Sequence, residues 1–274
     1  MENKIRTVLV SPHSDDIAYS IGGALLQDYF YKPVLMVTIF TKSNFTRSNF
    51  PLCVKLDNSE IISKMRHLED VQFTTKNDMR FLSFPFPEAS MRGISRQEMF
   101  SNVIPDSYTI FSDVYLALSG LIKTYACDLI VSPMGLGNHI DHIMVSDICN
   151  KIAHENNKKI VFYEDLPYAS FLTSNKIKTR ANTISPDLKP FKVDISEVYK
   201  DKLTNLDLYK TQIRSDFRAR IKFHALRLSI ENEGLLKQIW PQNIIRYLLF
   251  LSGDRCRGIY LFERLWANKP EGMR

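Results

Sequence analysis

Cysteine is scarce in this chain of 274 residues, and the four cysteines lie far apart in the sequence. Cys53, Cys127, Cys149 and Cys256 form no Cys-x-x-Cys pair, which argues against a thiolate zinc site and against a disulfide framework. Glycine and proline, with ten and twelve residues, are too few for a linker-rich or disordered chain. We interpret the cysteines as buried or half-buried free thiols, none of which is a nucleophile.

Long hydrophobic runs are also missing. The best candidate, residues 244–251, is interrupted by Arg246 and falls well short of the roughly 18 residues that a membrane span needs. The first ten residues contain no apolar core of a signal peptide. We therefore expect a cytoplasmic protein that does not insert into a membrane.

The remaining composition, 45% hydrophobic and 24% charged, is typical of a globular protein with a sizeable core. Its charge is unevenly distributed. Residues 1–174 carry 16 Lys and Arg against 19 Asp and Glu, whereas residues 175–274 carry 20 against 11. We therefore predict a single domain over residues 1–274, in which a catalytic core (1–174) is covered by a basic C-terminal part (175–274).

Apolar runs alternate with helical periodicities along the first part of the chain. The runs predict strands at residues 6–11, 34–40, 81–86, 128–132 and 160–163. The periodicities predict helices at residues 16–31, 59–71, 110–125 and 140–155, and residues 87–112 have no clear period. Such alternation predicts an α/β fold: a Rossmann-like, mostly parallel sheet with helices on both faces and a less regular C-terminal extension. In such sheets ligands bind beyond the carboxyl ends of the strands.

The last hundred residues contain two recognisable patterns. Residues 201–215 have apolar side chains at helical spacing, which need a core to bury against: Leu203, Leu206, Tyr209 and Ile213. Residues 258–266 resemble a late strand. Basic side chains recur every four residues and predict a mainly solvated stripe if this segment is helical: Lys210, Arg214, Arg218 and Lys222.

Two groups of histidine and aspartate follow predicted strands. His13, Asp15 and Asp16 lie where the first strand ends, and His139 and His142 lie three residues apart where a later helix begins. Taken alone, the first group is equally well explained by an N-cap aspartate beside a surface histidine. At one edge of a parallel sheet, however, two histidines and one aspartate can converge. They would form the nitrogen and oxygen ligand set of a catalytic zinc site, with an open position for water.

These groups resemble two sequence boxes of the PIG-L/LmbE superfamily of metal-dependent amino-sugar de-N-acetylases. The matching residues are His13-Ser14-Asp15-Asp16 with Gly22-Gly23, and His139-Ile140-Asp141-His142. Further matches lie at Arg66 and Glu69, at residues 163–168, and at Lys202, Tyr209 and Gln212. The resemblance spans residues 5–215. Ser14 and Ile140 replace common prolines, and neither change removes a metal ligand.

The resemblance implies a role for each matching residue. His13, Asp16 and His142 would bind the metal, which is Zn²⁺ or another divalent ion. Asp15 would be the general base that activates the attacking water. His139, oriented by Asp141, would stabilise the tetrahedral oxyanion or protonate the departing amine.

The implied activity is a zinc-dependent hydrolysis that removes the N-acetyl group from an N-acetylglucosaminyl substrate. Residues 11–13 and 163–168 look closer to members from antibiotic biosynthesis. An acidic pocket of Asp15, Glu164 and Asp165 would suit a cationic aminocyclitol glycoside such as N-acetylated paromamine. Asp165 or Tyr168 would contact the sugar, although a solvated turn before Pro167 explains both residues equally well.

Other classes of protein fit the sequence less well. A non-catalytic protein that binds a lipid or phosphosugar could use the same fold, but both boxes are intact. No Gly-x-Gly-x-x-Gly follows the first strand, which argues against a redox enzyme, and no nucleic-acid-binding motif is present. We therefore expect a small-molecule amino-sugar glycoside as partner and no nucleic acid, and a homo-oligomer is compatible with the sequence.

Overall fold

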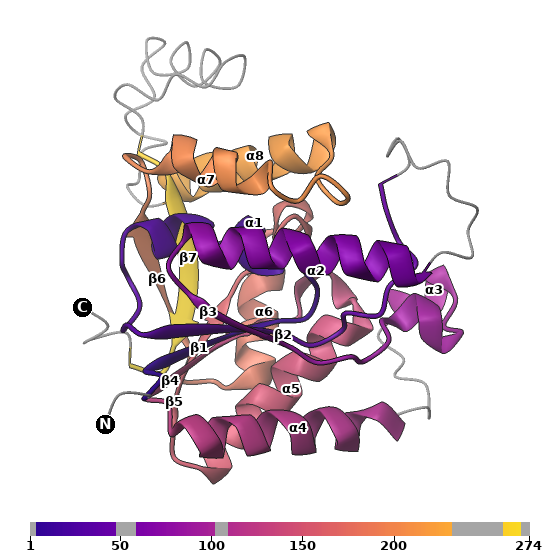
Figure 1. The fold of residues 1–274 in the computed structure, drawn as a ribbon. Helices are drawn as coiled ribbons and strands as arrows, with labels where there is room; N and C mark the ends of the chain where they lie inside the picture. The colour runs from indigo at the N-terminus through magenta and orange to yellow at the C-terminus, as the bar shows by residue number, and fades with distance from the viewer. Residues whose placement is uncertain (1–3, 48–58, 102–108, 232–259, 270–274) are drawn as a thin grey trace.

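A seven-stranded sheet of order β3-β2-β1-β4-β5-β7-β6 forms the centre of the computed structural model, which describes residues 4–47, 59–101, 109–231 and 260–269 (Figure 1). The strands are β1 (Thr7–Ser11), β2 (Val34–Thr38), β3 (Arg80–Ser83), β4 (Leu129–Pro133), β5 (Lys159–Tyr163), β6 (Lys189–Asp194) and β7 (Phe262–Ala267). Strands β1 to β5 pair in parallel, and β7 is antiparallel to both of its neighbours. The predicted α/β class with a mostly parallel sheet is therefore confirmed.

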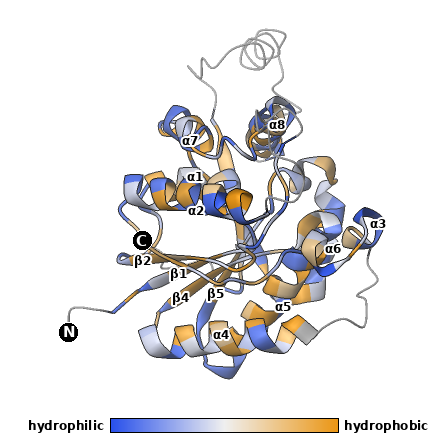
Figure 2. Ribbon diagram, turned by 45° about the vertical axis from the view of Figure 1, so that its right-hand side comes forward, coloured by the Kyte–Doolittle hydropathy of each residue, from blue (hydrophilic) through white to orange (hydrophobic). Residues whose placement is uncertain are grey.

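Helices cover both faces of the sheet. On one face lie α1 (Asp16–Leu26) and α2 (Ser59–Lys76), and on the other lie α4 (Thr109–Tyr125) and α5 (Ile140–Glu155) (Figure 1). The other helices are α3 (Arg96–Met99), α6 (Ser174–Ile184), α7 (Tyr199–Leu206) and α8 (Ser215–Glu231), with 3-10 turns η1 (Ala89–Arg92), η2 (Leu136–Asn138) and η3 (Tyr168–Phe171). The strands are mostly hydrophobic, whereas the helices show both hydrophobic and hydrophilic residues (Figure 2). This pattern is typical of strands buried between two helical layers.

Helix α1 is interrupted at Ile21, whose φ of −133° is not helical. The carboxylate of Glu263 on β7 caps the second half of the helix by accepting the backbone N–H groups of Gly23 and Ala24, at 2.9 and 2.7 Å. Lys202 on α7 donates to the same carboxylate at 2.6 Å. A Cβ at Gly23 would lie 2.6 Å from the side chain of Ile195, so this close approach requires glycine.

The C-terminal part of the chain packs on the sheet. Leu203, Leu206 and Tyr209 are buried in the core, and Ile213 is partly buried against it. The predicted helix over residues 201–215 is nevertheless wrong in its extent, because α7 ends at Leu206 and α8 begins at Ser215. The chain turns in between, and the Tyr209 hydroxyl of this segment donates to the buried Asp70, at 3.1 Å.

The predicted basic stripe does not form, and two structural facts explain why. Lys210 and Arg214 lie in the segment between the two helices, so they share no helical face with Arg218 and Lys222. The side chain of Lys222 is also buried rather than solvated. Arg214 and Arg218 form ion pairs with Asp216 and Asp207.

Other predictions of local structure differ in detail. The first helix ends at Leu26 rather than at residue 31, since the chain turns through Asp28, which has a φ of 51°. The aperiodic stretch after residue 87 contains η1 and α3, and the sequence reasoning missed α6 and β6. Cys127 and Cys149 are buried free thiols. Cys53, Cys256 and residues 244–251 lie outside the described residues. Among the described helices, none has both the length and the apolar character of a transmembrane segment.

Candidate functional site

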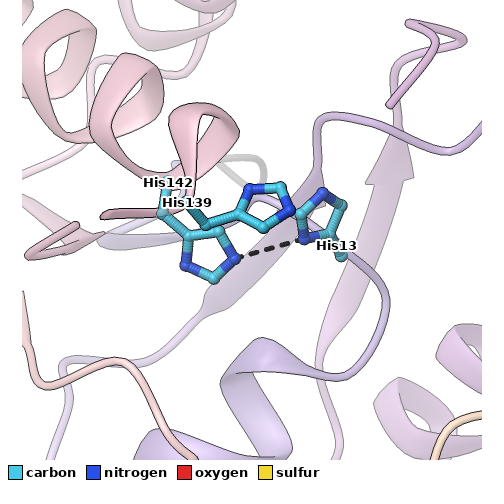
Figure 3. A group of neighbouring side chains, drawn as sticks. All are labelled: His13, His139 and His142. Atoms are coloured by element: carbon cyan, nitrogen blue, oxygen red, sulfur yellow. Dashed lines mark hydrogen bonds between the residues drawn. The ribbon is translucent and has the colours of Figure 1, made fainter. Parts of the chain in front are cut away.

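The predicted site residues meet at the carboxyl edge of the sheet, where β1 and β4 lie side by side. From β1 the chain continues to β2 and β3 on one side of the sheet. From β4 it continues to β5 on the other side, so the order of the strands reverses between β1 and β4. Ligands of doubly wound sheets bind at such a switch point. His13 follows β1, and His139 and His142 begin α5 after β4 (Figure 3).

Three ligand atoms come close to one another here. His13 Nδ1 lies 3.2 Å from His142 Nε2, and Asp16 Oδ2 lies 3.6 Å from the first nitrogen and 3.5 Å from the second. Ligands that bind one tetrahedral zinc ion at 2.0–2.1 Å are separated from each other by about 3.3–3.4 Å. The three atoms are therefore spaced so that all of them can bind the same ion.

His139 offers a nitrogen that could serve as the third ligand in place of the Asp16 oxygen. The ligand atoms of His13, His139 and His142 all lie within 4.8 Å of one another. The Nδ1 atom of His139 also accepts the backbone N–H of Asp141, at 3.3 Å. The described residues thus contain two overlapping donor sets, and the set with Asp16 has the distances of 3.2–3.6 Å that match a tetrahedral site.

A buried carboxylate stands behind each of the two histidines. Asp141 Oδ2 lies 3.0 Å from His13 Nε2, and Asp165 Oδ1 lies 2.7 Å from His142 Nδ1. In the tautomer in which each carboxylate accepts the ring N–H of its histidine, the lone pairs of His13 Nδ1 and His142 Nε2 face the ligand position. Such pairs of carboxylate and histidine are typical of zinc sites.

The site is crowded with buried charge, which perturbs its pKa values. Burial raises the pKa of Asp16 to about 6, against the opposing effect of His142 and His13. Burial lowers the pKa of His142, but Asp16 and Asp165 outweigh it and bring that pKa to about 9. Burial, partly offset by Asp141, holds the pKa of His139 well below its usual value.

Asp15 occupies a different position from its neighbour. It is the N-cap residue of α1, but its side chain makes no capping hydrogen bond, so capping does not explain it. Its side chain is half-buried, and its charge helps to raise the pKa of the buried Tyr19 and Tyr163 and of the half-buried Tyr168. The Asp15 carboxylate therefore lies near the site but is not one of the three closely spaced ligand groups of His13, Asp16 and His142.

The carboxylate of Asp141 is not placed as the sequence reasoning expected. We expected it to orient His139, but only its backbone N–H reaches that ring. The carboxylate accepts from His13, from the Ala89 N–H at 3.0 Å and from Arg92 Nη2 at 2.6 Å. The signal for these partners was absent from the sequence, because Ala89 and Arg92 belong to an aperiodic stretch.

The expected acidic pocket requires a second correction. Asp165 is fully buried, and its oxygens bind His142 and the Leu136 N–H, at 2.7 and 2.8 Å. Glu164 is buried as well and accepts from His224, Arg264 and Trp266. Internal donors occupy both carboxylates, so their positions do not support contact with a sugar. Asp165 instead positions His142.

Aromatic side chains surround the histidines. The Tyr168 ring lies 5.5 Å from that of His142 and 6.3 Å from that of His139. A Cβ at Gly137, whose φ is +83°, would lie 2.5 Å from Tyr168 Cβ, so glycine permits this approach. Phe100 lies edge-on to His139, with 5.1 Å between ring centroids, and keeps 37% of its surface exposed. Nothing in the sequence marks Phe100 for the site, since it lies in the aperiodic stretch.

The chain aligns over most of its length with a protein of known activity. It is 27% identical over 273 residues to 2'-N-acetylparomamine deacetylase of Streptomyces fradiae, covering 98% of this chain and 92% of that protein. A deacetylase from teicoplanin biosynthesis has the same fold, with a TM-score of 0.65 and 20% identity over 95% of this chain and 96% of that one. The zinc-inhibited form of a teicoplanin deacetylase gives a TM-score of 0.62 and 17% identity, with 95% and 97% coverage.

The same fold also occurs in an enzyme with a different reaction. The 4-carboxy-2-hydroxymuconate hydratase of Pseudomonas putida KT2440 gives a TM-score of 0.59 and 12% identity, covering 98% of both chains. No protein-family model matches the chain. The fold alone therefore does not determine the reaction, which depends on the side chains at the switch point between β1 and β4.

Proposed function

We propose, from the confirmed resemblance of this chain to the PIG-L/LmbE deacetylases, that it is a metal-dependent hydrolase that removes an N-acetyl group from an amino-sugar glycoside. The observation that carries the proposal is the spacing of the donor atoms of His13, Asp16 and His142, 3.2–3.6 Å apart, with a carboxylate behind each histidine. We assign these three residues as the metal ligands. Two nitrogens and one oxygen suit Zn²⁺, the metal we favour.

In this proposal each remaining residue has a separate task. A divalent ion, when bound, supplies the Lewis acidity that polarises an amide and makes water acidic. Asp15, adjacent in sequence to the ligand Asp16, takes the proton of the attacking water as general base. Water addition turns the amide carbon tetrahedral. Asp15 then returns its proton to the departing nitrogen as the C–N bond breaks, which leaves the free amine and acetate.

His139 has a geometry that favours one of its two expected roles. Its Nδ1 accepts the Asp141 backbone N–H, so a neutral ring carries its proton on Nε2. A neutral Nε2–H can donate to the oxyanion of the tetrahedral adduct. We therefore assign His139 to oxyanion stabilisation rather than to protonation of the amine.

The relative from Streptomyces fradiae, named for N-acetylparomamine, supports an aminoglycoside intermediate as the substrate class. Tyr168 and Phe100, beside His139, supply an apolar wall on which a sugar ring can pack. We propose that the acetamido group of the substrate enters between this wall and Asp15.

A panel of N-acetylated amino sugars, including N-acetylparomamine and free N-acetylglucosamine, tests this function by measuring the amine released by zinc-loaded protein. His142→Ala should lose both bound metal and amine release. His154→Ala, an exposed histidine on the same helix, is the matched control and should retain both. Full metal occupancy in His142→Ala would refute the ligand assignment. Metal binding without amine release from any substrate would favour a non-catalytic binding protein.

A further inference from the structure

The turn η1 holds the Asp141 carboxylate from two sides. Its first residue, Ala89, donates a backbone N–H to Asp141 Oδ2 at 3.0 Å, and its last residue, Arg92, donates Nη2 to Oδ1 at 2.6 Å. Oδ2 also faces His13 Nε2 at 3.0 Å. One short turn therefore fixes the position of the carboxylate that orients His13.

Arg92 is itself immobilised. Its Nη1 donates to the Pro87 carbonyl at 2.8 Å, and its guanidinium lies 5.2 Å from the centroid of the Phe40 ring. The same Phe40 ring lies 6.0 Å from that of His13. An arginine that makes two directed hydrogen bonds and stacks on a ring cannot be replaced by lysine without losing part of this geometry.

The energetics give Arg92 a specific importance. The side chain of Asp141 is fully buried, and a buried carboxylate is costly unless it is paired and hydrogen-bonded. Arg92 is the arginine that pairs with it in the described structure. Without this partner, the Asp141 side chain would be free to rotate, and His13 would lose its fixed acceptor.

We infer that Arg92 is a positioning residue for the metal site, acting through Asp141 on His13. This inference rests on the metal site of the proposed function. It assigns Arg92 neither to the substrate nor to the reacting atoms. Its consequence is that Arg92 sets the affinity for the metal even though it does not touch the ion.

The test measures metal affinity directly. Metal-free wild-type, Arg92→Met, Arg92→Lys and Asp141→Asn proteins are titrated with Zn²⁺ in competition with a chromogenic chelator. Arg92→Met should weaken binding by about tenfold to a hundredfold, the usual effect of losing a group behind a ligand, and Arg92→Lys should weaken it less. Arg214→Met is the matched control, because Arg214 also pairs with a carboxylate and lies 5.1 Å from a phenylalanine ring. The Zn²⁺ affinity of Arg214→Met should equal that of wild type.

The double variant Arg92→Met/Asp141→Asn separates positioning from general damage. If Arg92 acts through Asp141, the double variant should bind Zn²⁺ as weakly as Asp141→Asn alone. Additive losses, or an Arg92→Met affinity within twofold of wild type, would overturn the inference. A wild-type chain that binds no Zn²⁺ would overturn the metal site and this inference together. A chain that binds Zn²⁺ but releases no amine would refute only the proposed function.

Discussion

Replacing Lys202 by methionine should destabilise the protein strongly. Lys202 and Glu263 form an ion pair of 2.6 Å with side chains only 1% and 2% exposed. Methionine fills a similar volume but leaves the Glu263 carboxylate buried without its cation. Breaking a buried pair from one side costs about 3–5 kcal/mol, a large part of the 5–15 kcal/mol by which typical proteins are stable.

The expected result is a lower melting temperature in the metal-free protein. At about 2–4 °C per kcal/mol, the loss should lower Tm by roughly 6–20 °C. Differential scanning calorimetry measures this shift, and Lys64→Met, in an exposed pair with Glu60, should leave Tm unchanged. The variant Lys202→Met/Glu263→Gln should regain part of the loss, because the buried charge is then gone. A Lys202→Met protein that melts within about 2 °C of wild type would refute the reasoning.

Three further predictions concern the site. Asp15→Asn should keep its bound metal while turnover falls by about a hundredfold to ten-thousandfold, and near-normal amine release would place the base elsewhere. Asp165→Asn should retain the bond to the Leu136 N–H but weaken Zn²⁺ binding by about tenfold to a hundredfold in a chelator titration, and unchanged affinity would contradict its role behind His142. Phe100→Ala should raise KM by roughly tenfold with little change in kcat, whereas Phe100→Tyr should behave as wild type. An unaltered KM would remove Phe100 from the substrate wall.

The sheet could be predicted from the sequence because its strands are buried on both faces. Strands β1, β2 and β4 have all five of their residues buried and each contains three or four consecutive apolar residues, so they stand out as continuous segments. Strand β6 was missed because its residues are mostly half-buried or exposed, with charged Lys189, Lys192 and Asp194 among them. Its position depends on pairing with β7, about seventy residues later, and no local pattern encodes that contact.

The metal-ligand candidates could also be predicted, because two groups of histidine and aspartate each follow a predicted strand and together match two sequence boxes of one family. The residues that hold these candidate ligands in place could not be predicted. Asp141 was predicted to orient His139 because the two residues are close in sequence. Its carboxylate instead contacts His13, which is 128 positions away. Arg92 and Phe100 approach the site from a stretch without periodicity, so only the folded chain places them there.

Two basic side chains of the C-terminal part pair with carboxylates inside the protein. Arg264 on β7 pairs with Glu164 and Glu231, and Lys202 pairs with Glu263. Glu164 directly precedes Asp165, which stands behind His142, and β7 lies between β5 and β6 in the sheet. Arg264 therefore neutralises Glu164, a buried carboxylate next to the candidate site. Lys202 and Arg264 thus have partners within the fold, so their charge needs no nucleic-acid or membrane partner to explain it.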